Sequence, residues 1–169
     1  MTKAWNALLL LAVAVATSAV TSRPAAADPV VVGEEHCVIG VAPNDTLNLR
    51  TGPGTGFAIR GTLRPDACGI IVMEPCDDGW CKVEDGHHEG FVRSTFIAPV
   101  SPALYCVTGV AEDDRLNVRT GPSPRAQVAT TLAPNQCDIA FLPHAERGWQ
   151  RIRVDGWQGW VARRYLSGE

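Results

Sequence analysis

The residues of this sequence that could do chemistry are its cysteines, its histidines, and a group of aromatic and basic side chains near the C-terminal end. Nucleophilic catalysis requires a free cysteine or an activated serine with a base beside it. The six cysteines form an even set in a chain that carries signs of export, so disulfides explain them better than thiol chemistry. The sequence has no Gly-x-Ser-x-Gly element. We therefore predict a protein that is not an enzyme and needs no cofactor.

Three places in the sequence contain residues that could bind a metal ion. The run His-His-Glu at 87–89 could hold a metal together with His36, but it follows an Asp-Gly turn, and a solvated hairpin explains it better. Cys76 and Cys81 have the spacing of a zinc-ligand pair, yet no second pair follows at a suitable distance. The acidic run 112–114 lacks the ligand spacing of a calcium loop. No metal site is predicted.

The aromatic and basic residues near the C-terminus are the better candidates for binding a ligand. Arg151 and Arg153 alternate with apolar residues, so both should lie on the outward face of a strand. Trp157 follows an Asp-Gly turn, which predicts an exposed position at a hairpin tip. Trp149 and Tyr165 complete the candidate site, although core packing is the other interpretation for such aromatics. Together these side chains could bind carboxylates of a peptide, a glycan acid or an acidic protein.

An internal repeat organises the elements that must position these residues. The segment Leu47–Pro53 (Leu-Asn-Leu-Arg-Thr-Gly-Pro) returns almost unchanged as Leu116–Pro122, at an offset of 69 residues. The same offset relates a pair of cysteines, a Gly-Trp pair and a glycine in each half. Two copies of a unit of about 60 residues are too few for a solenoid and indicate two domains in tandem.

Each unit is predicted to be all-β. Short apolar or alternating runs are separated by Pro, Gly and Asp-Gly, and no helical period extends over a long stretch. A small closed or partly open barrel suits this size because it limits exposed sheet edges. The strands expected in the first unit span 37–41, 47–50, 58–63, 68–73, 80–83 and 88–93. A helical turn is expected after the last of them, at 94–96. The predicted units are 36–98 and 104–166, joined by a proline-containing linker at 99–103.

The repeat also predicts the disulfide pairing, because a duplicated unit should carry its own bridge. We expect one bridge in each unit and one local bridge in the first: Cys37–Cys68, Cys106–Cys137 and Cys76–Cys81. Each long bridge closes a loop for which chain entropy predicts roughly 3–4 kcal/mol of stabilisation. For a unit this small, which buries only a small core, that contribution matters.

The N-terminal segment and the charge indicate where the protein acts. Residues 1–27 combine Lys3, a short apolar run and a small-residue cleavage site, which predicts a signal peptide and a periplasmic or secreted protein. The alternative, a retained membrane anchor, is disfavoured because the apolar run is shorter than the ~20 residues of a spanning helix. No transmembrane segment is expected after cleavage.

The chain has a formal net charge of −3, which argues against nucleic acid as the main partner. The charge is uneven: residues 28–103 carry 5 basic and 11 acidic residues, whereas 104–169 carry 8 basic and 7 acidic.

The motif Leu-Asn-Leu-Arg-Thr-Gly-Pro, followed by Gly-Trp, Gly-aromatic-Val and a closing aromatic, resembles the bacterial SH3 (SH3b) domain. The second copy matches more closely, because the first has Phe91 and Phe96 where the second has Trp160 and Tyr165. The resemblance implies two tandem small SH3-like β-barrels. It also implies a non-catalytic binding role in the cell envelope, towards peptidoglycan or another envelope ligand. The alternative hypothesis is an envelope adaptor that docks an acidic protein partner through the basic hairpin of the second unit.

Overall fold

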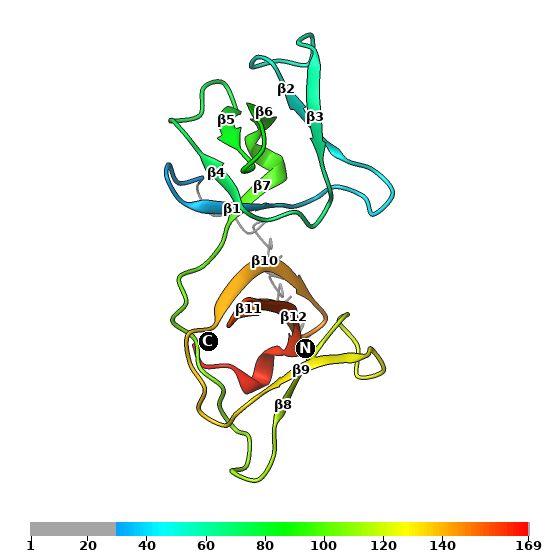
Figure 1. Ribbon diagram of the computed structural model, residues 1–169, viewed down its shortest axis with the longest axis vertical. Coiled ribbons are helices and arrows are strands. Elements are labelled where there is room, and N and C mark those ends of the chain that lie inside the picture. Colours follow the sequence, from blue (N-terminus) through cyan, green and yellow to red (C-terminus); the bar gives the residue numbers. More distant parts are fainter. Residues whose placement is uncertain (1–29, 169) are drawn as a thin grey trace, which may run out of the picture.

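The computed structural model describes residues 30–168 and contains two β units that lie one beyond the other along its longest axis (Figure 1). The predicted signal peptide at 1–27 lies outside the described residues. Within residues 30–168, no helix has the length and apolar character needed to cross a membrane.

The first unit is a seven-stranded antiparallel sheet with the strand order β3-β2-β6-β5-β4-β1-β7. A 3₁₀ turn, η1 (Ser94–Phe96), precedes its last strand, as the sequence predicts. The strands are β1 (Glu35–Val38), β2 (Leu47–Arg50), β3 (Ile59–Leu63), β4 (Ile70–Val72), β5 (Trp80–Glu84), β6 (Glu89–Arg93) and β7 (Ile97–Pro99).

The second unit is a five-stranded antiparallel sheet with the order β10-β11-β12-β8-β9. It ends in a second 3₁₀ turn, η2 (Arg163–Tyr165). The strands are β8 (Leu116–Arg119), β9 (Val128–Leu132), β10 (Ala140–Glu146), β11 (Trp149–Val154) and β12 (Trp157–Ala162).

The two sheets follow one plan despite their different strand counts. In the first unit, β1 pairs with β7 and β4 through partners that include Val38↔Ile97 and His36↔Ile70. At the equivalent places the second unit has only the isolated bridges Val107↔Leu166 and Tyr105↔Ile139. The same pairings therefore exist in both units, but in the second they are too short to count as strands.

The repeated motif forms the strand that the alternation predicts. β2 and β8 each show a buried, half-buried, buried, half-buried pattern, with Leu47 and Leu49 or Leu116 and Val118 facing the core. These residues join the apolar clusters of their own units, each formed from the inward faces of the strands. Each unit thus has its own hydrophobic core.

A repeated glycine lets β6 and β12 cross the motif strand closely. A Cβ added at Gly90 would lie 2.7 Å from the Arg50 carbonyl oxygen, and one at Gly159 would lie 2.8 Å from the Arg119 carbonyl oxygen. Backbone cannot give way as a flexible side chain can, so the close crossing requires glycine at both places.

The three predicted disulfides are all present: Cys37–Cys68, Cys106–Cys137 and Cys76–Cys81. Cys37–Cys68 and Cys106–Cys137 each join residues 31 apart in the sequence, at equivalent positions of the two units. Intradomain pairing is therefore confirmed.

The all-β prediction, with a closed or partly open barrel, is confirmed, and two predicted boundaries are corrected. Among residues 30–168 neither sheet closes on itself, because pairing stops at β3 and β7 in one and at β9 and β10 in the other; the barrels are open. The first strand starts at Glu35 and ends at Val38 rather than spanning 37–41, since Gly40 adopts a positive φ of 66° and turns the chain. Pro99, assigned to the linker, is the last residue of β7.

Candidate ligand-binding grooves

The arginine of the repeated motif shapes a loop beside the motif strand. Arg50 donates hydrogen bonds to the carbonyl oxygens of Thr55 (2.9 Å) and Phe57 (2.8 Å). Arg119 donates in the same way to the carbonyl oxygen of Ala126 at 2.8 Å. Both arginines therefore serve the fold. They hold the loop that follows the motif.

A groove of 790 Å³ lies between this loop, the η2 turn and the start of β11 in the second unit. Trp149 and Tyr165, both half-buried, contribute its aromatic surface. The charged residues that line it are Asp114, Arg115, Arg119, Arg147, Arg163 and Arg164. Its volume falls in the range that holds a small ligand or a short peptide segment.

The first unit has a groove of 920 Å³ at the equivalent place. Trp80 and Phe96 occupy the positions of Trp149 and Tyr165. Its charged lining residues are Asp45, Arg50, Asp78 and Arg93. The repeat therefore produces two grooves at equivalent places with different charges.

Asn117 and its equivalent Asn48 line the two grooves on the half-exposed face of the motif strands. A carboxamide offers two donors and one acceptor, which suits the N–H and C=O groups of a peptide backbone. No side-chain hydrogen bond involving Asn48 or Asn117 occurs among the described residues. These amides are therefore available to a ligand.

The aromatic residues of the two grooves differ in how they are covered. In the first, the Arg93 guanidinium lies 5.7 Å from the Trp80 ring centroid and donates to the Asp78 carbonyl oxygen at 2.9 Å. Ala162 replaces Arg93 in the second unit. There Arg164 stacks on Tyr165 instead, at 4.6 Å, so no arginine side chain covers Trp149 among the cation–π contacts of residues 30–168.

The five side chains predicted from the sequence to bind a ligand do not form one site. Trp149 and Tyr165 lie together in the groove. Trp157 is 53% exposed at the hairpin tip and does not line that groove. Arg151 and Arg153 face outward from their own core but contact the first unit. A role for any of the five in ligand binding stays a prediction.

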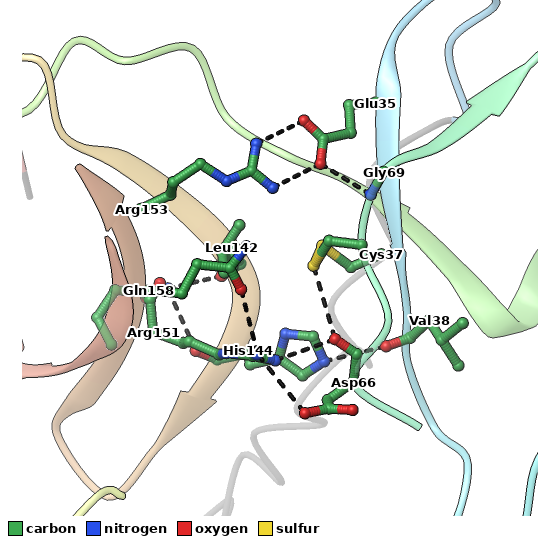
Figure 2. The surroundings of a disulfide bond; sticks show 12 residues. Glu35, Cys37, Val38, Asp66, Gly69, Leu142, His144, Arg151, Arg153 and Gln158 are labelled. Carbon is green, nitrogen blue, oxygen red and sulfur yellow. Dashed lines mark hydrogen bonds and ion pairs between the residues drawn. A yellow bond between two sulfur atoms is a disulfide. The ribbon is translucent and has the colours of Figure 1, made fainter. Parts of the chain in front are cut away.

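Figure 2 shows how the two arginines meet the first unit beside the Cys37–Cys68 disulfide. Arg153 forms a bidentate pair with Glu35, with N–O distances of 2.7 and 2.6 Å. Glu35 also accepts a hydrogen bond from the Gly69 amide at 2.8 Å. Arg151 donates to the Asp66 carbonyl oxygen at 3.2 Å and lies 3.6 Å from its carboxylate. The acidic group that these arginines bind belongs to the same chain.

The contact between the units shifts the pKa values of the charged residues that form it. The pKa of Glu35 is lowered, chiefly because Arg153 donates to its carboxylate, and this outweighs the opposing effect of burial. The pKa of Arg153 is raised for the same reason. The pKa of Arg151 is lowered mainly by burial, against the attraction of Asp66. The Glu35–Arg153 pair is thus the stronger of the two ion pairs.

His144 and the linker extend the contact. The His144 Nε2 atom lies 3.0 Å from the Val38 carbonyl oxygen, so this nitrogen carries the proton (Figure 2). Burial lowers the pKa of His144, and its Nδ1 is buried without a hydrogen-bond partner among the described residues. Ser101 of the linker exchanges two hydrogen bonds with the backbone of Phe141, at 3.0 and 2.7 Å. The linker is therefore held against β10.

Sequence reasoning did not single out Arg115 or Asn117, and it treated Arg147 and Arg164 only as neighbours of the hairpin. A signal was present in the repeat: these arginines stand where the first unit has Thr46, Asp78 and Thr95. The difference in net charge between the halves, one acidic and one basic, is a further signal, and it favours a contact between the units that the sequence analysis did not predict.

The family model of the bacterial SH3 domain matches residues 112–168. The second unit is thus similar to the bacterial SH3 domain over most of its length. Its motif strand, both 3₁₀-turn arginines and the whole hairpin lie inside the match. Trp149 and Tyr165 of the groove therefore lie within the matched residues.

A wider match links the chain to a protein of Bacillus subtilis (strain 168), YrvJ, which is named as a candidate N-acetylmuramoyl-L-alanine amidase. The two sequences are 28% identical over 146 residues, which is 79% of this chain and 27% of that protein. The chain thus spans about a quarter of its relative.

Among solved structures, the chain is similar to NlpC2 and NlpC1 from Trichomonas vaginalis, at 13% and 12% identity. The matches cover 82% of this chain in each case, and 49% and 46% of those chains, with a TM-score of 0.38 for both. Scores this low support no further statement about this chain.

Proposed function

We propose that this chain is an exported, non-catalytic binding module that attaches to peptidoglycan through the groove of its bacterial SH3 domain. The observation that carries the proposal is the groove itself, with Trp149, Tyr165 and Asn117 along one channel and a counterpart in the first unit. Aromatic surfaces with a few polar groups are typical of ligand sites. The similarity to a candidate cell-wall amidase supports the choice of peptidoglycan as ligand.

Two observations support a binding role rather than a catalytic one. All six cysteines lie in disulfides, so none of them offers a thiolate. The described residues contain no group of three or more His, Cys, Asp or Glu side chains placed to hold a metal ion. Disulfides persist in oxidising compartments, which supports export to the periplasm or the medium.

The domain limits belong to this proposal. We take 36–98 and 104–166 as the two units, with the first a diverged copy of the second. An acidic protein partner on the basic hairpin would have to displace Glu35 and Asp66, which already pair with Arg153 and Arg151. We therefore place the ligand in the groove and not on the hairpin.

Cosedimentation with insoluble peptidoglycan at low salt tests the proposal. We expect the protein to pellet with the wall, and Asn117→Ala and Trp149→Ala to reduce the bound fraction several-fold. Leu104→Ala is the control, because Leu104 is an apolar side chain 77% exposed outside the groove. Because Trp149 is half-buried, each variant is first checked for folding by circular dichroism.

Three results would contradict the proposal. The protein could stay wholly in the supernatant, or the groove variants could bind as the parent does. Loss of binding in Trp157→Ala with full binding in Trp149→Ala would move the site to the hairpin tip. Release of soluble muropeptides by the purified protein would contradict the non-catalytic part.

A further inference from the structure

The two grooves lie at equivalent places but differ in charge. The second is lined by five arginines and one aspartate, whereas the first is lined by two arginines and two aspartates. Counted as formal charges, the second groove is strongly positive and the first is neutral. The equivalent positions of the grooves would let the two units bind one ligand, but the difference in their charge disfavours a shared charged ligand.

One pair of aspartates contributes nothing to this difference in charge. Asp45 and Asp114 occupy equivalent places, and each accepts a hydrogen bond from the amide of the next residue at 2.7 Å. They cap the same turn in both units and cancel in the comparison. The difference comes from Arg115, Arg147 and Arg164, which replace Thr46, Asp78 and Thr95.

These three arginines are exposed and only weakly engaged by the protein. Arg147 has an 89% exposed side chain and lies 3.8 Å from the carboxylate of Glu146, whose own side chain is 51% exposed. Arg115 donates only to the carbonyl oxygen of Asp114 at 3.2 Å, and Arg164 donates to the Tyr165 hydroxyl at 3.3 Å. Neither Arg115 nor Arg164 takes part in an ion pair among the described residues.

The two remaining arginines of the groove are committed to the fold. Arg119 holds the loop, and Arg163 donates to the Leu166 carbonyl oxygen at 3.0 Å while it lies 4.9 Å from the Phe141 ring centroid. The free guanidinium groups are thus those at the rim, around Trp149 and Tyr165.

The geometry points to a peptide with a free carboxylate as the ligand of the second groove, which the first groove does not take. A guanidinium binds a carboxylate through two parallel hydrogen bonds. The open Trp149 ring and the Asn117 amide suit the apolar and backbone parts of a short peptide. This assignment rests on the proposed function, because it names the chemical group of peptidoglycan that the groove would read.

The test compares native insoluble peptidoglycan with the same material after its carboxylates have been converted to amides. At low salt we expect the parent protein to bind the amidated wall about tenfold more weakly. Arg115→Thr with Arg164→Thr, which installs the residues of the first unit, should lower affinity for the native wall about tenfold. At 1 M salt, where the Debye length is about 3 Å, both differences should shrink.

The matched control removes the same charge elsewhere. Arg60→Thr with Lys82→Thr takes two positive charges from side chains that line neither groove, and it should change binding less than twofold. In the reverse experiment, Thr46→Arg with Thr95→Arg in the first unit should restore binding to the weakened protein.

Equal binding of native and amidated wall by a protein that needs Trp149 would overturn the assignment and leave the proposed function intact. So would a charge control that weakens binding as much as the groove variant does. Inorganic phosphate, added at the concentration of the wall carboxylates, provides one more test. If it displaced all of the protein from the wall, the assignment would be overturned in favour of a phosphate ligand. No binding to either wall would instead be a failure of the proposed function. A titration with an acetylated alanine tripeptide tests the groove independently. The amide chemical shifts of the protein are compared with those seen on adding the same tripeptide with a C-terminal amide in place of its carboxylate.

Discussion

The two units of this chain follow one plan but stabilise it with different side chains at equivalent positions. Near its second hairpin, the first unit joins Cys76 to Cys81. The second unit has Ala145 and Gln150 there. The buried Gln150 amide donates to the carbonyl oxygens of Leu142 (2.7 Å) and His144 (3.2 Å). A covalent link in one unit is thus replaced by hydrogen bonds in the other.

This replacement changes how the units relate to each other. The Gln150 amide satisfies carbonyls where the β10–β11 register shifts, and β10 runs from Ala140 to Glu146 where its counterpart β4 spans only Ile70–Val72. The longer strand lies on the side of the second unit that faces the first (Figure 1), and its His144 contacts the Val38 carbonyl oxygen. The unit that lacks this disulfide is thus the one whose β10 contacts the other unit, and the two copies are not interchangeable.

The largest expected effect tests whether both units depend equally on their long bridge. Cys106→Ser with Cys137→Ser should destabilise the second unit by about 3–4 kcal/mol, because the unfolded loop is no longer closed. Cys37→Ser with Cys68→Ser should have a similar effect on the first unit, which keeps Cys76–Cys81. Denaturant unfolding followed by amide signals of each unit measures this. If the second unit keeps its stability without a bridge, the repeated disulfide is not what holds it.

The next effect tests the exchange of a bridge for an amide. Gln150→Ala should lower the free energy of unfolding by about 2 kcal/mol, since buried carbonyls lose their donor. Gln127→Ala, an exposed glutamine, serves as the control. Ala145 and Gln150 are paired in register, so Ala145→Cys with Gln150→Cys should form a disulfide and restore stability. Thermal unfolding and intact mass follow both; a double variant that keeps two free thiols would contradict the equivalence.

A smaller effect concerns the docking of the two units. Glu35→Gln should weaken docking by about 1–2 kcal/mol, because it removes a bidentate ion pair whose side chains are 25% and 30% exposed. Glu34→Gln, a neighbouring exposed carboxylate, should have little effect. Rotational correlation times from amide relaxation report docking, because docked units tumble as one body. Unchanged tumbling in Glu35→Gln would show that Ser101 and His144 hold the units together without the ion pair.

The smallest effect is a pH dependence with two windows, both on the acid side. His144 has a pKa lowered by burial, with Arg151 and Asp66 nearby, so its full contribution is present above about pH 6.5. Docking should weaken as the pH falls from there towards the folded pKa, since the buried neutral ring resists protonation. Glu35, whose pKa is lowered by Arg153, contributes above the ordinary carboxylate range and loses its effect as the pH falls through its folded pKa.

Amide relaxation as a function of pH measures both windows. His144→Gln should remove the upper window and leave the lower one. His36, buried in the first unit with its pKa also lowered, affects the stability of that unit and not its docking, so the two signals separate. An upper window that persists in His144→Gln would assign it to another group.

Much of the fold was readable from the sequence because it depends on local periodicity and on repetition. The alternation in Leu47–Arg50 predicted a half-buried strand, and the Asp85-Gly86 turn predicted the hairpin that follows β5. The offset between the copies identified all three bridges without geometry. The limits of β1 and the strand character of Pro99 were missed, because pairing with β7 is non-local.

The candidate site was only half predictable. Outward alternation correctly placed Arg151 and Arg153 away from their own core, but alternation says nothing about what lies outside that core. Trp149 and Tyr165 were singled out as aromatics, yet their meeting in one groove joins the start of β11 to η2.

By itself the sequence determined the β character of the chain, its duplication and its disulfide pairing, because strand periodicity and turn chemistry act over a few residues and the copies repeat them. The tertiary structure decided which arginines pair with acidic residues of the other unit and which remain exposed. Arg153 meets Glu35 across 118 residues, whereas Arg115, Arg147 and Arg164 stay at the rim of a groove. Charge partners are selected by distance in space, and only the packed chain fixes that distance.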